Sequence, residues 1–310
     1  MTQHEVEHTI TVDAPAAEVY RLIAEVENWP LIFPPCVHVD VVERGSSDER
    51  IRIRATANGE PKSWTSRREL DPDKLRIGFA QEVSAPPVAA MGGTWVIEEE
   101  GAGTRIRLLH HYRAVDDDPA GLAWIDEAVD RNSRSELAAL KVSMERVTDT
   151  ALTLSFADSV RIDGSAKDVY DFVNEAQAWQ ERLPHVAKVD LREDTPGLQV
   201  LRMDTRTADG ATHTTESVRV CFPHHKIAYK QTTLPALLQL HTGYWEFTED
   251  ADGVTTATSQ HTVILDPDNI TAVLGAGAGV EQARVFIRGA LGGNSRATLG
   301  LAKAYAEVRR

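Results

Sequence analysis

"APAAEVYRLIAEVENWPLIFP", residues 14–34, recurs about 150 positions later as "GSAKDVYDFVNEAQAWQERLP", residues 164–184. The two copies keep the same spacing between a tyrosine, a tryptophan and a proline: Tyr20 and Tyr170, Trp29 and Trp179, Pro34 and Pro184. A repeat at a fixed offset decides the architecture first, because each copy has to be one structural unit. The sequence therefore predicts two copies of one domain, residues 1–150 and residues 151–310, and 310 residues suit two domains of ordinary size.

The repeat continues towards the end of each half. "GTWVIEEEGAGTRIRLLHHYR" from Gly93 matches "GYWEFTEDADGVTTATSQHTV" from Gly243, which pairs Trp95 with Trp245 and His111 with His261. "RNSRSELAALK" and "GNSRATLGLAK" then close the two halves, and the second half carries an insertion before this last match. We expect paired residues to hold equivalent positions in the two domains.

Each half has the same order of predicted elements. A β-like run comes first (residues 8–12 and 152–162), and a short helix follows, beginning near Pro15 or Ser165. Alternating strands separated by Gly, Asn and Asp turns come next, and each half ends in a long helix with a periodic apolar stripe. This pattern predicts an α+β fold of two tandem helix-grip domains. In each, a curved antiparallel sheet wraps around the long C-terminal helix and leaves a cavity that suits an apolar ligand.

Composition excludes several classes of protein. The chain is 42% hydrophobic, and it has neither a run of about 18 apolar residues nor a secretion signal, so we expect a cytoplasmic protein that does not contact membranes. A net charge of −14 argues against nucleic acid, because phosphate binding needs clustered cations. Cys36 and Cys221 lack partners at metal-ligand spacing, so we expect reduced, structural cysteines and no metal.

"KSWTSRREL", residues 62–70, is the segment that points to a binding site. Side chains alternate faces along a strand, so Trp64, Ser66 and Arg68 share a face with Leu70. A buried arginine needs acceptors or a wet cavity, which favours a lined pocket. The alternative from these residues alone is that Arg68 lies near a strand end and reaches water over Trp64.

Four motifs together resemble the two-domain aromatase/cyclases of type II polyketide synthases, which are START-like helix-grip proteins. They are "NWPLIFPP" at 28–35, "WTSRREL" at 64–70, "GGTW" at 92–95 and the "NSR" helix that ends near Lys141. The resemblance implies an enzyme that needs no cofactor and acts on a poly-β-ketone tethered to an acyl carrier protein. It further implies that a ketoreductase has reduced the chain, and that the enzyme closes the first ring between carbons 7 and 12 with loss of water.

The resemblance also assigns roles to residues of the first half. Arg68 and Ser66 match the inward arginine and serine that polarise substrate oxygens, which suits enol chemistry because a fixed guanidinium stabilises developing negative charge. His111 is the candidate proton shuttle, although a lone histidine on a strand is more often structural. The expected substrate-binding residues are Trp29, Phe33, Trp64, Met91, Trp95 and Asn132.

The second half repeats the serine and arginine as Ser217 and Arg219, with Thr215 in place of Trp64. Ser217, Arg219, Trp245 and His261 therefore form a competing site. Because the first half matches the family pattern better, we expect the catalytic pocket there and a structural or accessory second domain. A non-catalytic lipid or polyketide carrier of the same fold is the alternative function. The expected partners are the carrier protein and other synthase subunits, including the ketoreductase, and we expect a monomer.

Overall fold

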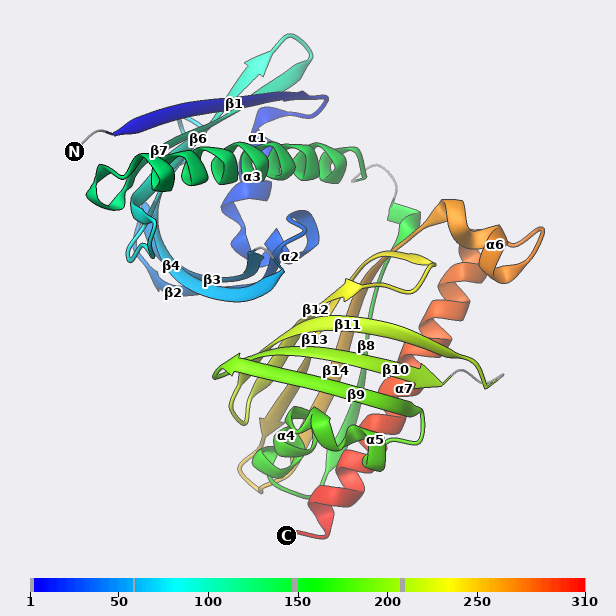
Figure 1. The fold of residues 1–310 in the computed structure, drawn as a ribbon. Coiled ribbons are helices and arrows are strands. Elements are labelled where there is room, and N and C mark those ends of the chain that lie inside the picture. The colour runs from blue at the N-terminus through cyan, green and yellow to red at the C-terminus, as the bar shows by residue number, and fades with distance from the viewer. Residues whose placement is uncertain (1–2, 58, 147–149, 207–209, 310) are drawn as a thin grey trace. The chain divides into compact units, whose positions relative to one another are not determined.

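The computed structural model describes residues 3–57, 59–146, 150–206 and 210–309. The chain divides into two compact units, Met1–Asp149 and Thr150–Arg310. Both units contain a seven-stranded antiparallel sheet and a long helix near the C-terminal end of the unit (Figure 1).

The first unit runs from a strand through two short helices into a meander of strands. Its sheet order is β1-β7-β6-β5-β4-β3-β2, so the first strand pairs with the last and the others follow as neighbours. Its elements are β1 (His4–Val12), α1 (Ala16–Ala24), η1 (Val26–Asn28), α2 (Trp29–Ile32), β2 (Cys36–Arg44), β3 (Asp48–Ala57), β4 (Glu60–Asp71), β5 (Arg76–Gln81), β6 (Val88–Glu100), β7 (Gly103–Ala114), η2 (Val115–Asp117) and α3 (Pro119–Arg146).

The second unit repeats this order and adds a short helix. Its sheet order, β8-β14-β13-β12-β11-β10-β9, is the same as that of the first sheet. Its elements are η3 (Thr150–Leu152), β8 (Thr153–Ile162), α4 (Ala166–Asn174), η4 (Ala176–Ala178), α5 (Trp179–Arg182), β9 (Val186–Thr195), β10 (Leu198–Arg206), β11 (Thr212–Phe222), β12 (Lys226–Thr233), β13 (Leu238–Glu249), β14 (Thr255–Leu265), η5 (Pro267–Asn269), α6 (Ile270–Leu274) and α7 (Val280–Glu307).

The long helices bury their apolar stripes against the sheets, as the periodicity predicted. In α3, Leu137 and Leu140 belong to the main core of the first unit, and Ile125 packs beside Tyr112 in a second cluster. The prediction of two tandem helix-grip domains of START-like type is confirmed by this architecture and by the solved structures described below. None of the helices in the described ranges is long and apolar enough to cross a membrane.

Helix α7, like α3, packs in two apolar clusters, and the residues between the clusters of α7 include Gly292, Gly293 and Ser295. Ala283 and Ile287 pack in one cluster near the start of the helix, and Leu299 and Ala302 pack in another. Small side chains between two well-packed clusters leave space next to the sheet. The inserted segment forms η5, α6 and a glycine-rich link to α7.

Candidate active site in the second domain

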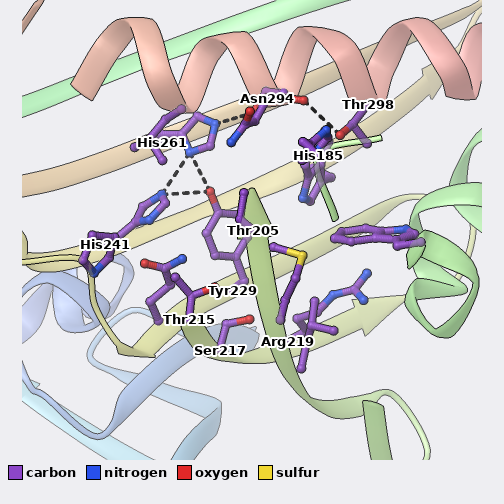
Figure 2. Close-up of a pocket in the computed structure, with 18 of the residues that line it drawn as sticks. His185, Thr205, Thr215, Ser217, Arg219, Tyr229, His241, His261, Asn294 and Thr298 are labelled. Carbon is purple, nitrogen blue, oxygen red and sulfur yellow. Dashed lines mark hydrogen bonds between the residues drawn. The ribbon is translucent and has the colours of Figure 1, made fainter. Parts of the chain in front are cut away.

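A pocket lies between α7 and the concave face of the second sheet (Figure 2). The pocket is partly open to solvent, and its empty volume of about 850 Å³ includes solvent space at its mouth. Trp179 and Trp245 supply apolar wall, while Ser217, Arg219 and His261 supply polar groups. All four predicted second-domain residues, Ser217, Arg219, Trp245 and His261, therefore line one pocket, because alternate positions of each strand point inwards.

Arg219 is held at this pocket by the end of helix α4. Its Nη2 donates to the carbonyl oxygen of Val173 at 2.7 Å, and its guanidinium carbon lies 5.3 Å from the centre of the Trp179 ring. Carbonyls at a helix C-terminus carry partial negative charge, which suits a cation. Nη1 of Arg219 is buried and has no hydrogen-bond partner among the described residues. A buried donor without a partner is costly, so this N–H is available to an oxygen of a ligand in the pocket that Arg219 lines.

Arg68 occupies the equivalent position in the first domain but is neutralised there. It donates to the carbonyl oxygens of Ile23 at 3.0 Å and Ala24 at 3.2 Å, and its guanidinium lies 5.2 Å from the Trp29 ring. Its Nη1 also pairs with Glu49 Oε1 at 2.8 Å, and both side chains are at most 2% exposed. Burial lowers the pKa of Arg68 to about 10 even with this carboxylate beside it.

The residue opposite each arginine on the neighbouring strand makes this difference. Glu49 pairs with Arg68 across β3 and β4, whereas Gln199 pairs with Arg219 across β10 and β11. A carboxylate cancels the guanidinium charge, while an amide leaves that charge available. Arg219 is therefore the arginine equipped to bind an anionic oxygen, and Arg68 is committed to an internal ion pair.

Removing one partner of the buried pair should destabilise the first domain. Arg68→Met leaves the buried Glu49 with only the exposed Arg44, whose Nη2 lies 3.3 Å from Glu49 Oε2, and loss of one partner of a buried ion pair typically costs about 3–5 kcal/mol. The double variant Arg68→Met/Glu49→Leu should recover most of that loss because no charge remains buried. Hydrogen-exchange mass spectrometry on peptides from residues 4–146 measures the effect domain by domain. Equal protection in wild type and Arg68→Met would contradict the buried ion pair.

Three polar side chains from three strands meet at the pocket (Figure 2). The Tyr229 hydroxyl lies 2.8 Å from His261 Nδ1 and 3.3 Å from His241 Nε2, and the two histidine nitrogens are 2.9 Å apart. On its other side, His261 Nε2 contacts the Ser295 hydroxyl of α7 at 2.7 Å. We call Tyr229, His241 and His261 the tyrosine–histidine cluster.

Burial keeps the whole cluster neutral. It lowers the pKa of His261 to about 4 and that of His241 well below its usual range, and the neighbouring His261 lowers the latter further. Burial also raises the pKa of the Tyr229 hydroxyl. Near neutral pH the cluster therefore holds two uncharged imidazoles and a protonated phenol, each of which can donate or accept a proton.

The predicted equivalence of His111 and His261 is wrong by one residue. Gly243 pairs with His261, but its counterpart Gly93 pairs with His110. Four residues separate the paired Glu99 and Thr104, whereas five separate the equivalent pair Glu249 and Thr255, and this additional residue shifts the later strand. A shift of one residue moves a side chain to the opposite face. His111 is accordingly exposed, and His110 is the histidine that turns inwards.

The first domain lacks most of the tyrosine–histidine cluster. His110 is present, with its Nδ1 3.4 Å from the Ser133 hydroxyl and its pKa lowered by burial to about 4. However, Phe79 pairs with Gly93 where Tyr229 pairs with Gly243, so a phenylalanine replaces the tyrosine. By the same register Met91 takes the place of His241. The first domain thus keeps the fold and one inward histidine, and it lacks the tyrosine and the second histidine.

The other predicted first-domain residues take ordinary structural positions. The Trp29 and Phe33 ring centres are 5.4 Å apart and those of Phe33 and Trp95 are 6.5 Å apart, and Trp64 packs against the same core. The Ser66 hydroxyl donates to the carbonyl oxygen of Ala80 at 3.0 Å. These contacts hold the domain together, and substrate binding by these residues stays a prediction.

Met91 and Asn132 lie outside the core that Trp29, Phe33, Trp64 and Trp95 help to form. Met91 packs against a separate cluster with Tyr112, and Asn132 is exposed on α3, where the next residue, Ser133, is the one that faces His110. Substrate binding by Met91 and Asn132 also stays a prediction.

Sequence reasoning missed Tyr229, His241 and Ser295. They lie on three different elements, and each taken alone resembles an ordinary strand or helix residue. The available signal was the repeat itself, because aligning the halves shows Tyr229 opposite Phe79 and His241 opposite Met91. Polar residues that replace apolar ones at inward positions of one copy indicate a site in that copy. Among the described residues, no group of three or more His, Cys, Asp or Glu side chains is arranged to hold a metal ion.

The lowered pKa of His261 gives a direct test of the cluster. Its imidazole Cε1–H signal in NMR spectra of the full chain should titrate near pH 4, and comparison with His261→Gln assigns the signal. An unfolded chain binds this proton near pH 6.5, so the second domain should lose stability as the pH falls from about 6.5 to about 4. Titration of His261 near 6.5 would show that it is not buried as described.

Comparison with known proteins identifies the family. The family model described as polyketide cyclase/dehydrase and lipid transport matches residues 3–145 and, a second time, residues 153–307. The chain belongs to this family. The granaticin polyketide synthase bifunctional cyclase/dehydratase of Streptomyces virginiae is 51% identical over 300 residues, covering 96% of this chain and 98% of that protein. The actinorhodin counterpart of Streptomyces coelicolor is 47% identical over 315 residues, covering 98% and 97%.

Two solved structures match along almost the whole chain. The di-domain ARO/CYC BexL from the BE-7585A biosynthetic pathway has a TM-score of 0.93 and 70% identity, covering 98% of this chain and 99% of BexL. StfQ from the steffimycin pathway has a TM-score of 0.88 and 36% identity, with the same coverage. The resemblance to two-domain aromatase/cyclases is thereby confirmed, and so is the expected enzyme class, polyketide cyclase/dehydratase.

Proposed function

We propose that this enzyme closes and dehydrates the first ring of a ketoreduced poly-β-ketone, and that it does so in the second-domain pocket. The granaticin and actinorhodin relatives are bifunctional cyclase/dehydratases of polyketide synthases, which supports an enzyme that serves both steps. The substrate arrives on an acyl carrier protein after a ketoreductase has acted, and closure joins carbons 7 and 12. These finer points extend the family resemblance to this chain.

The unpaired N–H of Arg219 is the observation that supports placing the proposed reaction in the second-domain pocket. Aldol closure and loss of water both pass through an enolate, whose oxygen gains negative charge as the reaction proceeds. Nη1 of Arg219 is buried and unpaired within the described structure, and no carboxylate faces this arginine from the neighbouring strand. A guanidinium fixed in advance and shielded from water stabilises an enolate more than a solvated one does. Arg68 cannot stabilise an enolate in this way, because its guanidinium is already ion-paired with Glu49.

The pocket walls account for ring selection. A flexible poly-β-ketone has many possible aldol pairs, and binding it in one folded conformation selects the product and lowers the barrier. Trp179 stacks beneath the Arg219 guanidinium, and Trp245 lines the same pocket, so the carbonyl that Arg219 binds is fixed against rigid aromatic surface. Ser217, two residues before Arg219 on the same face, offers a second hydrogen bond to substrate oxygen.

The first domain has a supporting role in this proposal. Its arginine is neutralised, its inward tyrosine and second histidine are replaced by Phe79 and Met91, and its aromatic residues pack as core. Membership of a polyketide synthase pathway implies other synthase subunits as partners. We include the carrier protein and the ketoreductase among them, and we propose that the chain acts as a monomer because both domain copies are present in one chain.

Product profiling in a reconstituted minimal synthase with ketoreductase tests the location. Arg219→Met should lower the yield of aromatised first-ring product by about 100-fold or more, the usual cost of removing one donor to an oxyanion. The matched control is Arg68→Met/Glu49→Leu, which removes the equivalent arginine without leaving a buried charge and should keep most of the yield. Loss of product only in that control would place the chemistry in the first domain, where the sequence alone had favoured it.

A further inference from the structure

We propose that the tyrosine–histidine cluster is the acid–base device for the water-loss step, with His241 as base, Tyr229 as acid and His261 as the residue that positions Tyr229. The inference rests on the proposed function of the second-domain pocket and adds to it the groups that move protons. Arg219 accounts for charge on the enolate oxygen, but an arginine neither removes a C–H proton nor protonates a leaving hydroxyl near neutral pH.

The hydrogen-bond pattern gives the cluster a direction. We assign the Nε2–H tautomer to His261, so that Nε2 donates to Ser295 Oγ at 2.7 Å; Ser259 Oγ lies 3.2 Å from the same nitrogen and donates to Ser295 Oγ at 3.1 Å. His261 Nδ1 is then an acceptor, and the Tyr229 hydroxyl donates to it at 2.8 Å. We assign the same tautomer to His241, whose Nε2 lies 2.9 Å from His261 Nδ1 and 3.3 Å from the Tyr229 oxygen. In this arrangement His241 Nδ1 carries a lone pair.

The free atom of the cluster is that His241 nitrogen. His241 lines the pocket and is only 3% exposed. Its Nδ1 is buried and has no hydrogen-bond partner among the described residues. Buried polar atoms in proteins are nearly always satisfied, so an unpaired one in a pocket indicates a place for a ligand. In a residue that lines the pocket, an unpaired nitrogen of a neutral imidazole is suited to accept a proton from substrate carbon.

The proposed step balances within the protein. The α-C–H proton of the β-hydroxy ketone moves to His241 Nδ1, while the electron pair forms the enolate that Arg219 binds. As the carbon–carbon double bond forms, the C–O bond of the β-hydroxyl breaks. That oxygen takes the Tyr229 hydroxyl proton and leaves as water, and Tyr229 regains a proton from His241 Nε2. His241 ends as its other tautomer, still neutral, and returns to the first by proton exchange with water after product release.

The neutrality of the cluster fits this exchange. Burial lowers the pKa of both imidazoles, and a tautomer swap needs neither of them to become charged. In the resting state His261 orients the Tyr229 hydroxyl by accepting a hydrogen bond from it. Ser295, on α7, holds the His261 ring in place. The helix therefore sets the orientation of the acid.

The first domain supplies a natural comparison inside the same chain. Phe79 and Met91 hold the positions of Tyr229 and His241, so Tyr229→Phe and His241→Met introduce side chains that this fold already carries there. Both variants should fold. The matched control is His110→Gln in the first domain, which removes the inward histidine of the copy that lacks the cluster.

The test follows two products in the reconstituted synthase with ketoreductase: the aromatised ring and the closed ring that still holds its water. Tyr229→Phe, His241→Met and the double variant should each slow water loss by about 100-fold or more, so that the hydrated ring accumulates while ring closure continues. The double variant should be no slower than the worse single variant, because the two groups act in one step. His110→Gln should behave like wild type.

Two outcomes would overturn the proposal. In one, the variants make aromatised product at the wild-type rate. In the other, ring closure and water loss fall together, which a merely structural role predicts. Failure of the proposed function looks different: Arg219→Met would then leave both products unchanged, whatever the cluster variants do.

Discussion

Both domains depend on one interaction, a buried guanidinium clamped between the C-terminal carbonyls of a short helix and the face of a tryptophan. Arg68 and Arg219 make it with nearly the same geometry, against Trp29 and Trp179. This contact holds the short helix against the sheet and buries a positive charge. Burying a charge costs free energy unless a group of opposite charge pairs with it. In the first domain Glu49 pairs with Arg68. In the second domain we propose that the substrate oxyanion pairs with Arg219. The residue opposite on the neighbouring strand, glutamate against glutamine, thus separates an ion-paired arginine from one with an unpaired N–H.

Much of the fold could be read from the sequence because the repeat, the strand alternation and the helix periodicity are all local signals. The inward face of "WTSRREL" was predicted correctly, since Ser66 and Arg68 are both buried. The pairing of His111 with His261 failed because one additional residue in a turn moves the following strand to the opposite face, and turn length is not visible from strand composition. The role of Arg68 was equally hidden, because it depends on Glu49, a cross-strand neighbour that only the hairpin register identifies.

The second site was hidden for another reason. Tyr229, His241 and His261 lie on three strands, and their contacts exist only once those strands pair. Comparing the two copies recovers part of this information, because an internal repeat acts as its own reference. Where one copy has Phe79 and Met91 and the other has tyrosine and histidine, the equivalent positions have apolar side chains in one copy and hydrogen-bonding side chains in the other. After a duplication, one copy can keep the stability and the other the reaction.

We propose that Arg219, the second-domain arginine, binds the oxyanion of the substrate. Isothermal titration of the full chain with a naphtholate, an aromatic oxyanion that mimics the enolate, measures this binding. We expect one binding site per chain, retained in Arg68→Met/Glu49→Leu and weakened by at least tenfold in Arg219→Met, which corresponds to about 1.4 kcal/mol. Binding that survives in Arg219→Met and disappears in the first-domain double variant would contradict the proposal.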